Sequence, residues 1–257
     1  MTKAIFITGA GGGIGAATAK LFLKKGWKVG LYDRDKQALA QLASHYSNDK
    51  VRAGYLDVTD AAGWHSCLED FFAWSGRLDV LLNNAGILYS GPFEDTALEK
   101  HIKTFQVNVE GVLIGCHAAL PYLKQSRDSR IINLSSASAI YGQADLASYS
   151  SSKFAVRGLT EALDVEWQKY GVRVLDIMPM FVQTAMVTDM NAGSIRKMGV
   201  HLTAEHVAKV IYQASTASHR YAKTHWPVGL SSRAFFSLSG LAPARFTRWV
   251  NQRLSQE

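Results

Sequence analysis

Three side chains suited to moving a proton lie within a short stretch of the sequence. Tyr149 and Lys153 are four residues apart, a spacing that puts both on one face of a helix. A phenol has a pKa of about 10 and is a poor base at neutral pH, but a neighbouring ammonium group favours its phenolate form. Ser136 lies 13 residues before Tyr149, just past the apolar run from Ile131 to Leu134. These residue types suit proton exchange with an alcohol or carbonyl oxygen, which the serine hydroxyl would hold in place.

A glycine-rich segment near the N-terminus is suited to binding a dinucleotide. Residues 8–15 read Thr-Gly-Ala-Gly-Gly-Gly-Ile-Gly, after a short apolar run and before a predicted helix. Glycines let the backbone approach a pyrophosphate without a clash of Cβ atoms. The N–H groups at the start of the helix can then bind the phosphates. This context favours a nucleotide site over a glycine-rich turn that binds nothing.

Asp33 ends the second apolar run, 20 residues after Gly13. A carboxylate there can accept hydrogen bonds from both hydroxyls of the adenosine ribose and would repel a 2′-phosphate. No basic residue lies at positions 10–12 to receive that phosphate, although Arg34 is adjacent. The pattern favours NAD as cofactor, with NADP as the alternative.

Short apolar runs alternating with helix-like segments predict the elements that position these residues. We expect strands at residues 4–7, 28–32, 51–56, 80–82, 130–134 and 172–178. We expect helices at 13–25, 35–45, 61–74, 98–125 (one helix or two), 148–170 and 203–214. Such alternation indicates a parallel sheet with helices on both faces. Because no linker interrupts the 257 residues, the chain is predicted to be one α/β domain, a Rossmann-type doubly wound parallel sheet spanning 1–257.

The motifs, in order from residue 3 to about residue 185, resemble those of the short-chain dehydrogenase/reductase family. The resemblance is carried by the glycine segment, Leu56-Asp57-Val58, the Asn-Asn-Ala-Gly sequence at 83–86, the segment 105–111 and the Ser…Tyr…Lys spacing. It implies an NAD-binding oxidoreductase. Together with Asp33, the implied cofactor contacts are Gly9, Gly13, Ile14, Gly15, Asp57, Val58, Asn83, Ala85, Gly86, Tyr149, Lys153, Val182 and Thr184.

The resemblance also implies a catalytic set of Asn108, Ser136, Tyr149 and Lys153. Tyr149 would be the acid/base, and the spacing favours Ser136 over Ser135 as the residue that holds the reacting oxygen. Lys153 would also bind the nicotinamide ribose, and Asn108 would position a water molecule behind that lysine.

The chain departs from the family after the sixth predicted strand, where Pro179-Met180 replaces the usual Pro-Gly. We therefore expect the Met180 side chain to project toward the substrate. Other residues expected at an apolar substrate pocket are Ile87, Tyr89, Ala137, Ala139, Tyr141, Phe181 and Met186. The weakly patterned segment 183–200 is expected to be a flap over this pocket, with an ordinary surface excursion as the alternative.

The functional prediction is hydride transfer between nicotinamide and a CH–OH or carbonyl group of an apolar alcohol or ketone. The alternative is a non-catalytic dinucleotide-binding redox sensor or regulator, although such proteins usually lose the tyrosine or lysine. Two cysteines without a CxxC pattern and scattered histidines predict no metal site. No signal peptide or membrane-spanning run is evident, and a cytoplasmic protein is expected.

The formal net charge is +7, and the C-terminal residues supply most of it. From Arg220 onward there are six basic residues and one acidic residue, a balance of +5. The basic extension, residues 228–257, could form an amphipathic helix for peripheral membrane contact, pack on another subunit, close the pocket, or remain a solvated helix. No nucleic-acid partner is expected, because no binding motif accompanies the charge. The family resemblance implies a homodimer or homotetramer built on the helices that contain Asn108 and Tyr149.

Overall fold

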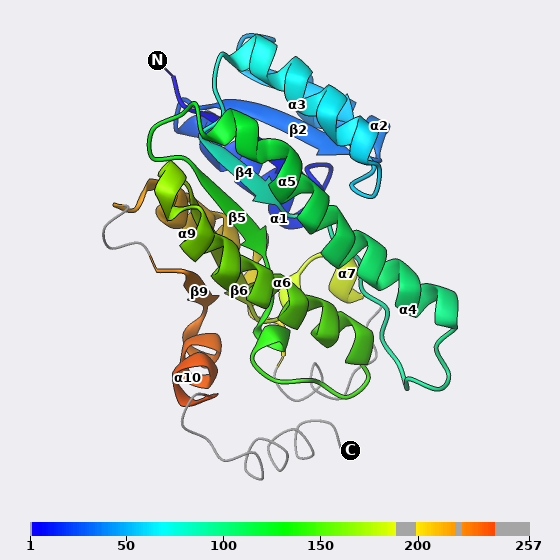
Figure 1. The fold of residues 1–257 in the computed structure, drawn as a ribbon. Helices are drawn as coiled ribbons and strands as arrows, with labels where there is room; N and C mark the ends of the chain where they lie inside the picture. Colours follow the sequence, from blue (N-terminus) through cyan, green and yellow to red (C-terminus); the bar gives the residue numbers. More distant parts are fainter. Residues whose placement is uncertain (1, 189–198, 219–222, 240–257) are drawn as a thin grey trace.

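A computed structural model describes residues 2–188, 199–218 and 223–239 of the chain. Its centre is a seven-stranded parallel sheet in the order β3-β2-β1-β4-β5-β6-β9 (Figure 1). The strands are β1 (Ala4–Thr8), β2 (Lys28–Asp33), β3 (Val51–Tyr55), β4 (Val80–Asn83), β5 (Arg130–Leu134), β6 (Arg173–Pro179) and β9 (His225–Val228). Every residue of β1 and β4 is buried, as expected of central strands covered on both faces.

Helices cover both faces of the sheet, which confirms the predicted doubly wound α/β fold (Figure 1). The first hydrophobic core unites one sheet face with α1 (Gly13–Lys24), α2 (Lys36–Ala43) and α9 (Ala204–Thr216). The second core unites the other face with α3 (Ala61–Ser75), α5 (Gly111–Leu123) and α6 (Ala147–Glu166). The sheet is thus buried between two layers of helices.

The helical stretch predicted at 98–125, left open as one helix or two, is a single run with an irregular turn. It consists of α4 (Leu98–Phe105), a π-helical turn at Gln106–Glu110 and α5. The backbone passes through all three parts in helical conformation, and the Gly111 N–H bonds the carbonyl of Gln106. Such π turns occur often at functional sites, and this one contains Asn108.

The last strand of the sheet and the short elements around the predicted flap were not predicted from the sequence. Strand β9 is only four residues long and contains Pro227. A proline in so short a segment argues against a strand when only the sequence is considered. Proline is tolerated there because β9 is an edge strand. A second small sheet pairs β7 (Val182–Gln183) with β8 (Leu202–Thr203). The described helices also include α7 (Ala185–Thr188), α10 (Leu230–Ser239) and two 3-10 helices at Ala137–Ala139 and Gln168–Tyr170.

Two predicted regions fall partly outside the described residues. The predicted flap at 183–200 begins in β7 and α7, but residues 189–198 lie outside the description. Of the basic extension at 228–257, residues 228–239 form the end of β9 and α10, and residues 240–257 lie outside the description. Within the described ranges, no helix combines the length and apolar character needed to cross a bilayer.

Candidate active site

A cavity of about 320 Å³ lies at the carboxyl ends of the central strands. Strands β1 and β4 are neighbours in the sheet but not in the sequence, and a crevice forms where the connections diverge in this way. The lining comprises Gly9, Gly12, Gly13, Ile14, Asp33, Asn84, Ala85, Gly86, Leu88, residues 134–138, Gln143, Tyr149, Lys153, residues 179–182, Thr184, Ala185 and Met186. The size is within the range of pockets that bind small molecules.

The glycine segment forms one side of this cavity. Gly9 and Gly13 have φ angles of 64° and 49°, a region that favours glycine. A Cβ atom on Gly15 would lie 2.1 Å from the Gly9 carbonyl oxygen, so the glycine lets α1 start directly against the turn. Gly12, the N-cap of α1, provides no side-chain cap. The N–H groups of the first turn are therefore free of side-chain capping bonds and suited to an anion.

Asp33 stands at the end of β2, at the rim of the cavity. Its carboxylate accepts hydrogen bonds from the backbone N–H groups of Gly11 at 2.9 Å and Asp35 at 3.0 Å. A carboxylate has about four acceptor positions, so capacity remains for a ligand. The neighbouring Arg34 extends to Asp57, with 3.7 Å between guanidinium and carboxylate.

The Asn-Asn-Ala-Gly sequence after β4 holds the glycine turn in place. The Asn84 amide donates to the carbonyls of Thr8 and Gly9, both at 2.9 Å. The Thr8 hydroxyl accepts in return from the backbone N–H groups of Asn84 and Ala85. Asn84 also lines the cavity, although it was absent from the predicted contacts. Its position within the Asn-Asn-Ala-Gly motif could have indicated that it lies at the cavity.

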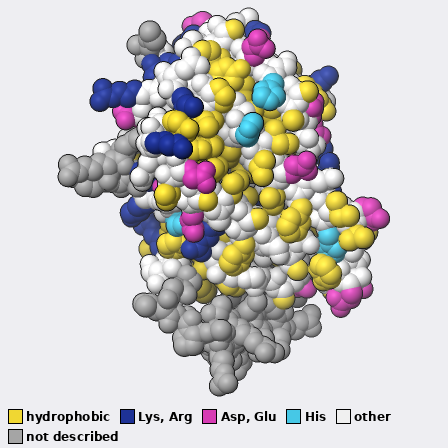
Figure 2. All heavy atoms as spheres, in the orientation of Figure 1, with side chains coloured by type: hydrophobic (Ala, Val, Ile, Leu, Met, Phe, Trp, Pro, Cys, Tyr) yellow, Lys and Arg dark blue, Asp and Glu magenta, His cyan; other side chains and the backbone are white. Residues whose placement is uncertain are grey.

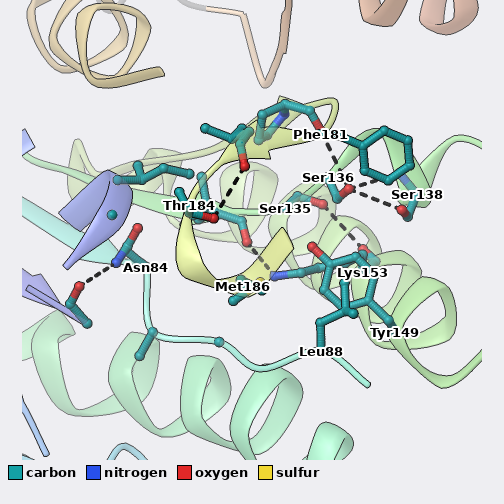
Figure 3. Close-up of a pocket in the computed structure, with 18 of the residues that line it drawn as sticks. Asn84, Leu88, Ser135, Ser136, Ser138, Tyr149, Lys153, Phe181, Thr184 and Met186 are labelled. Carbon is teal, nitrogen blue, oxygen red and sulfur yellow. Dashed lines mark hydrogen bonds between the residues drawn. The ribbon is translucent and has the colours of Figure 1, made fainter. Parts of the chain in front are cut away.

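Ser136, Tyr149 and Lys153 converge on the cavity from two elements (Figure 3). Tyr149 and Lys153 share one face of α6, with the Lys153 nitrogen 5.5 Å from the Tyr149 ring centre. The Lys153 ammonium donates to the Leu134 carbonyl at 2.8 Å. Ser136 caps a short 3-10 helix at Ala137–Ala139, and its hydroxyl accepts the Ser138 N–H at 3.1 Å.

Burial shifts the two titratable groups of this set in opposite directions. Desolvation raises the pKa of Tyr149 to about 12, opposed in part by a hydrogen bond with Ser136. Desolvation lowers the pKa of Lys153 to about 8. At neutral pH the phenol is therefore protonated and the lysine is mostly charged, so both groups carry a proton.

Asn108 lies behind this set, and both atoms of its side-chain amide are hydrogen-bonded within the chain. The amide oxygen accepts the Ile87 N–H at 2.8 Å, and the amide nitrogen donates to the Ile87 carbonyl at 2.8 Å and to the Ser152 hydroxyl at 3.2 Å. Asn108 does not line the cavity, and a Cβ atom on Gly86 would lie 3.2 Å from its amide oxygen. The side chain thus ties the loop after β4 to the π-helical turn.

Ten of the predicted cofactor contacts line the cavity, and four do not. The four that lie outside its lining have other contacts within the fold. Gly15 packs α1 on the glycine turn, and the Asn83 amide donates to Asn133 at 2.9 Å, joining β4 to β5. Val58 packs close to Gly111 of α5, and Asp57 accepts the Thr59 N–H and hydroxyl. These four are Gly15, Asp57, Val58 and Asn83.

Where Pro179-Met180 replaces the family's usual Pro-Gly, the backbone has an ordinary conformation. Among the described residues, only Asp128 and Asp145 combine a side chain with a positive φ, so Met180 needs no glycine conformation. Met180 lines the cavity, as expected. Thr184 also lines it, and a Cβ atom on Gly13 would lie 3.2 Å from the Thr184 methyl group.

The predicted substrate pocket needs correction. Ala137, Met180, Phe181 and Met186 line the cavity, but Ile87, Tyr89, Ala139 and Tyr141 do not. Ala139 and Tyr141 are buried in a third hydrophobic cluster, and Tyr89 lines a neighbouring, more polar cavity that shares Leu88, Ala185 and Met186. The cavity is also lined by Leu88, Ser138, Gln143 and Ala185, which were not predicted because strand and loop signals do not show which side chains turn inward. In the described part of the chain, no His, Cys, Asp and Glu side chains cluster as a metal site would require.

Comparisons with known proteins agree with this architecture. A model of the short chain dehydrogenase family matches residues 3–194. The 3-alpha-(or 20-beta)-hydroxysteroid dehydrogenase of Mycobacterium tuberculosis is 35% identical over 223 residues, 84% of each chain. A short-chain dehydrogenase structure from Streptomyces avermitilis aligns with a TM-score of 0.84 at 27% identity, covering 98% of both chains. The 3-ketoacyl-(acyl-carrier-protein) reductase from Brucella melitensis, solved with NADH, aligns at 0.81 and 28% identity, covering 88% of this chain and 96% of that one.

Proposed function

Because the chain belongs to the short-chain dehydrogenase/reductase family, we propose that it transfers a hydride between NAD(H) and an apolar alcohol or ketone, with Tyr149 as the acid/base. The observation that carries the proposal is a single cavity. It brings Ser136, Tyr149 and Lys153 together with a glycine turn and the Asp33 carboxylate. A proton-transfer set and a dinucleotide-binding turn therefore face the same space.

The described residues fit a nicotinamide dinucleotide. The uncapped first turn of α1 would bind the pyrophosphate, and Asp33 has acceptor capacity for the adenosine ribose hydroxyls. The same carboxylate would repel a 2′-phosphate, and Arg34 is engaged with Asp57, which supports NAD over NADP. We also assign Val182, Thr184 and Lys153 to the nicotinamide half, because they line the cavity beside the catalytic set.

When bound, the dinucleotide supplies or accepts the hydride. The chain's own residues move the proton. In reduction, Tyr149 donates its phenolic proton to the carbonyl oxygen while the Ser136 hydroxyl holds that oxygen. In oxidation, Tyr149 accepts the alcohol proton, and the nearby Lys153 ammonium stabilises the phenolate. Asn108 positions the loop after β4 through Ile87.

The substrate half of the cavity is mostly apolar. Leu88, Ala137, Met180, Phe181 and Met186 line it, and such walls favour a hydrocarbon body over a charged one. One relative is named as a 3-alpha-(or 20-beta)-hydroxysteroid dehydrogenase, which supports this class.

We further propose a homodimer or homotetramer, because large apolar side chains on α4, α5 and α6 are exposed. From the sequence we also propose peripheral membrane contact through the basic extension and a cytoplasmic location.

The proposed function is tested by following NADH and NADPH absorbance over a panel of apolar ketones and alcohols. We expect turnover with NAD(H). Replacing Tyr149 by Phe should lower kcat by about 10²–10⁴-fold, because the acid/base is lost, while NADH binding measured by calorimetry should persist. Full activity of the Tyr149→Phe protein would refute the assigned role. Tight NADH binding without any turnover would instead favour the sensor.

A further inference from the structure

One residue that lines the cavity has a buried polar atom without a partner among the described residues. Among the residues that the structure describes, three buried side-chain nitrogen or oxygen atoms lack a hydrogen bond: Asn83 Oδ1, Arg130 Nε and Gln143 Oε1. Of these three residues, only Gln143 lines the cavity, and it is 4% exposed. Leaving such an acceptor unpaired is unfavourable, so this amide calls for a physical explanation.

The rest of Gln143 is held in place by other bonds. Its amide nitrogen donates to the Tyr141 hydroxyl at 3.1 Å, and its backbone N–H donates to the Ser150 hydroxyl at 3.1 Å. Ser150 neighbours Tyr149 on α6. Gln143 is thus fixed to the helix that carries the acid/base, while its amide oxygen has no partner among the described residues.

We propose that the Gln143 amide binds a second hydroxyl group of the substrate, apart from the oxygen that reacts. The substrate class is accordingly an apolar alcohol or ketone with an additional hydroxyl, which deepens the proposed function and rests on it. Ser136 and Tyr149 already serve the reacting oxygen, so the amide has a separate role. In a mostly apolar pocket, one such polar group sets the orientation of the ligand.

A hydroxyl fits this position better than other polar groups. It donates to the amide oxygen and could also accept from an N–H, so it fits whichever way the amide is turned. A substrate ammonium is disfavoured because the cationic Lys153 lines the same cavity. With the amide oriented as in the structure, its free atom is an acceptor and offers no donor to a substrate carboxylate.

The test compares cyclohexanol with the three positional cyclohexanediols, and cyclohexanone with the matching hydroxycyclohexanones. For the wild-type protein with NAD(H), kcat/KM for at least one hydroxylated compound should exceed that of its parent by about tenfold or more, because the parent leaves the amide unpaired. In the Gln143→Met protein, which keeps the side-chain length without the amide, this ratio should fall to within about twofold of unity.

Two matched variants separate specificity from damage to the fold. Gln143→Met leaves the buried Tyr141 hydroxyl without its partner, so the Tyr141→Phe/Gln143→Met protein removes both groups and should also lose the preference. Tyr141→Phe alone keeps the Gln143 oxygen and should retain the preference. Melting temperature and NADH affinity report whether each variant is folded.

The outcomes distinguish this inference from the function on which it rests. Equal wild-type kcat/KM for every hydroxylated compound and its parent would overturn the inference and leave the proposed function standing. A preference that survives in both Gln143 variants would also overturn it. Absence of hydride transfer with every compound in both directions would count against the proposed function and, with it, against the inference.

Discussion

At the scale of single residues, the glycines of the nucleotide turn differ in what they contribute. Gly12 and Gly15 belong to the same motif, yet a Cβ atom on Gly12 would meet nothing within 4 Å, whereas one on Gly15 would lie 2.1 Å from the Gly9 carbonyl oxygen. Gly12 also has an extended backbone, with φ at −161°, which any residue adopts. Gly15 is therefore required for packing, and Gly12 leaves room beside the cavity.

We predict that Gly15→Ala lowers the free energy of unfolding by roughly 1–3 kcal/mol, because α1 must move away from the turn to admit the methyl group. Gly12→Ala should cost at most about 1 kcal/mol, because alanine is a poorer N-cap than glycine but meets no neighbouring atom. Urea denaturation followed by circular dichroism measures both. If both variants lost the same free energy of unfolding, the close approach of Gly15 to the Gly9 carbonyl would not be the cause of the loss.

At the scale of elements, the edge strand β9 is joined to the sheet and to α6 through one histidine. His225 pairs with Asp176 in the β6–β9 register, and its Nδ1 lies 3.0 Å from both Asp176 carboxylate oxygens. Its Nε2 lies 3.0 Å from Glu161, which also contacts Arg157 on the same helix. A neutral imidazole has one N–H, so both contacts together require the protonated ring. Phe236 of α10 packs beside it.

We predict that this junction weakens as the pH rises. Burial opposes charging of His225, but the hydrogen bond and charge of Asp176 outweigh it, so the pKa of His225 is raised in the folded chain. Its contribution to stability is complete below the unfolded value of about 6.5 and is lost as the pH rises through the folded value. Unfolding free energy measured from pH 6 to pH 9 should therefore decline.

The control for this decline is His225→Gln, which cannot be charged. Its stability should be lower than that of the wild type at pH 6 and should change less with pH. Glu161→Gln, which keeps the side-chain size, should reduce the slope without removing it, because Asp176 remains. If the His225→Gln protein followed the wild-type slope, some other group would be responsible.

At the scale of the whole molecule, one face carries an apolar surface. Figure 2 shows hydrophobic side chains gathered over the helices that lie in front of the sheet. The exposed members on α4, α5 and α6 are Leu98, Ile102, Phe105, Leu113, Phe154 and Val165. A large exposed apolar patch on a protein surface marks a contact with another molecule, and we propose a second copy of the chain as that molecule, because symmetric oligomers pair like surfaces.

We predict that light scattering gives two or four times the mass of one chain. Phe105→Asp and Phe154→Asp, each placing a charge on the patch, should shift the protein toward one chain, because a buried unpaired charge disfavours association. Tyr55→Asp serves as a control, since Tyr55 is similarly exposed on β3, away from these helices. A wild-type protein of single-chain mass would refute the assembly.

Local patterns in the sequence were enough to predict the fold class and the family. Strand and helix periodicity depends on neighbouring residues, and so do the glycine turn at 8–15 and the four-residue spacing of Tyr149 and Lys153. Strand β9 was missed because its four residues include Pro227, and only its place at the edge of the sheet makes that proline acceptable.

The tertiary structure alone decided which side chains share a cavity and which are left unpaired. Leu88 and Gln143 line the cavity while Ala139 and Tyr141 turn into a core cluster, although all four lie in loops or short helices without a repeating pattern. His225 finds Asp176 across 49 positions of sequence. Such contacts depend on the packing of strands and helices that are distant in the chain, so residue type and local spacing determine the kind of chemistry available, and the fold determines where it happens.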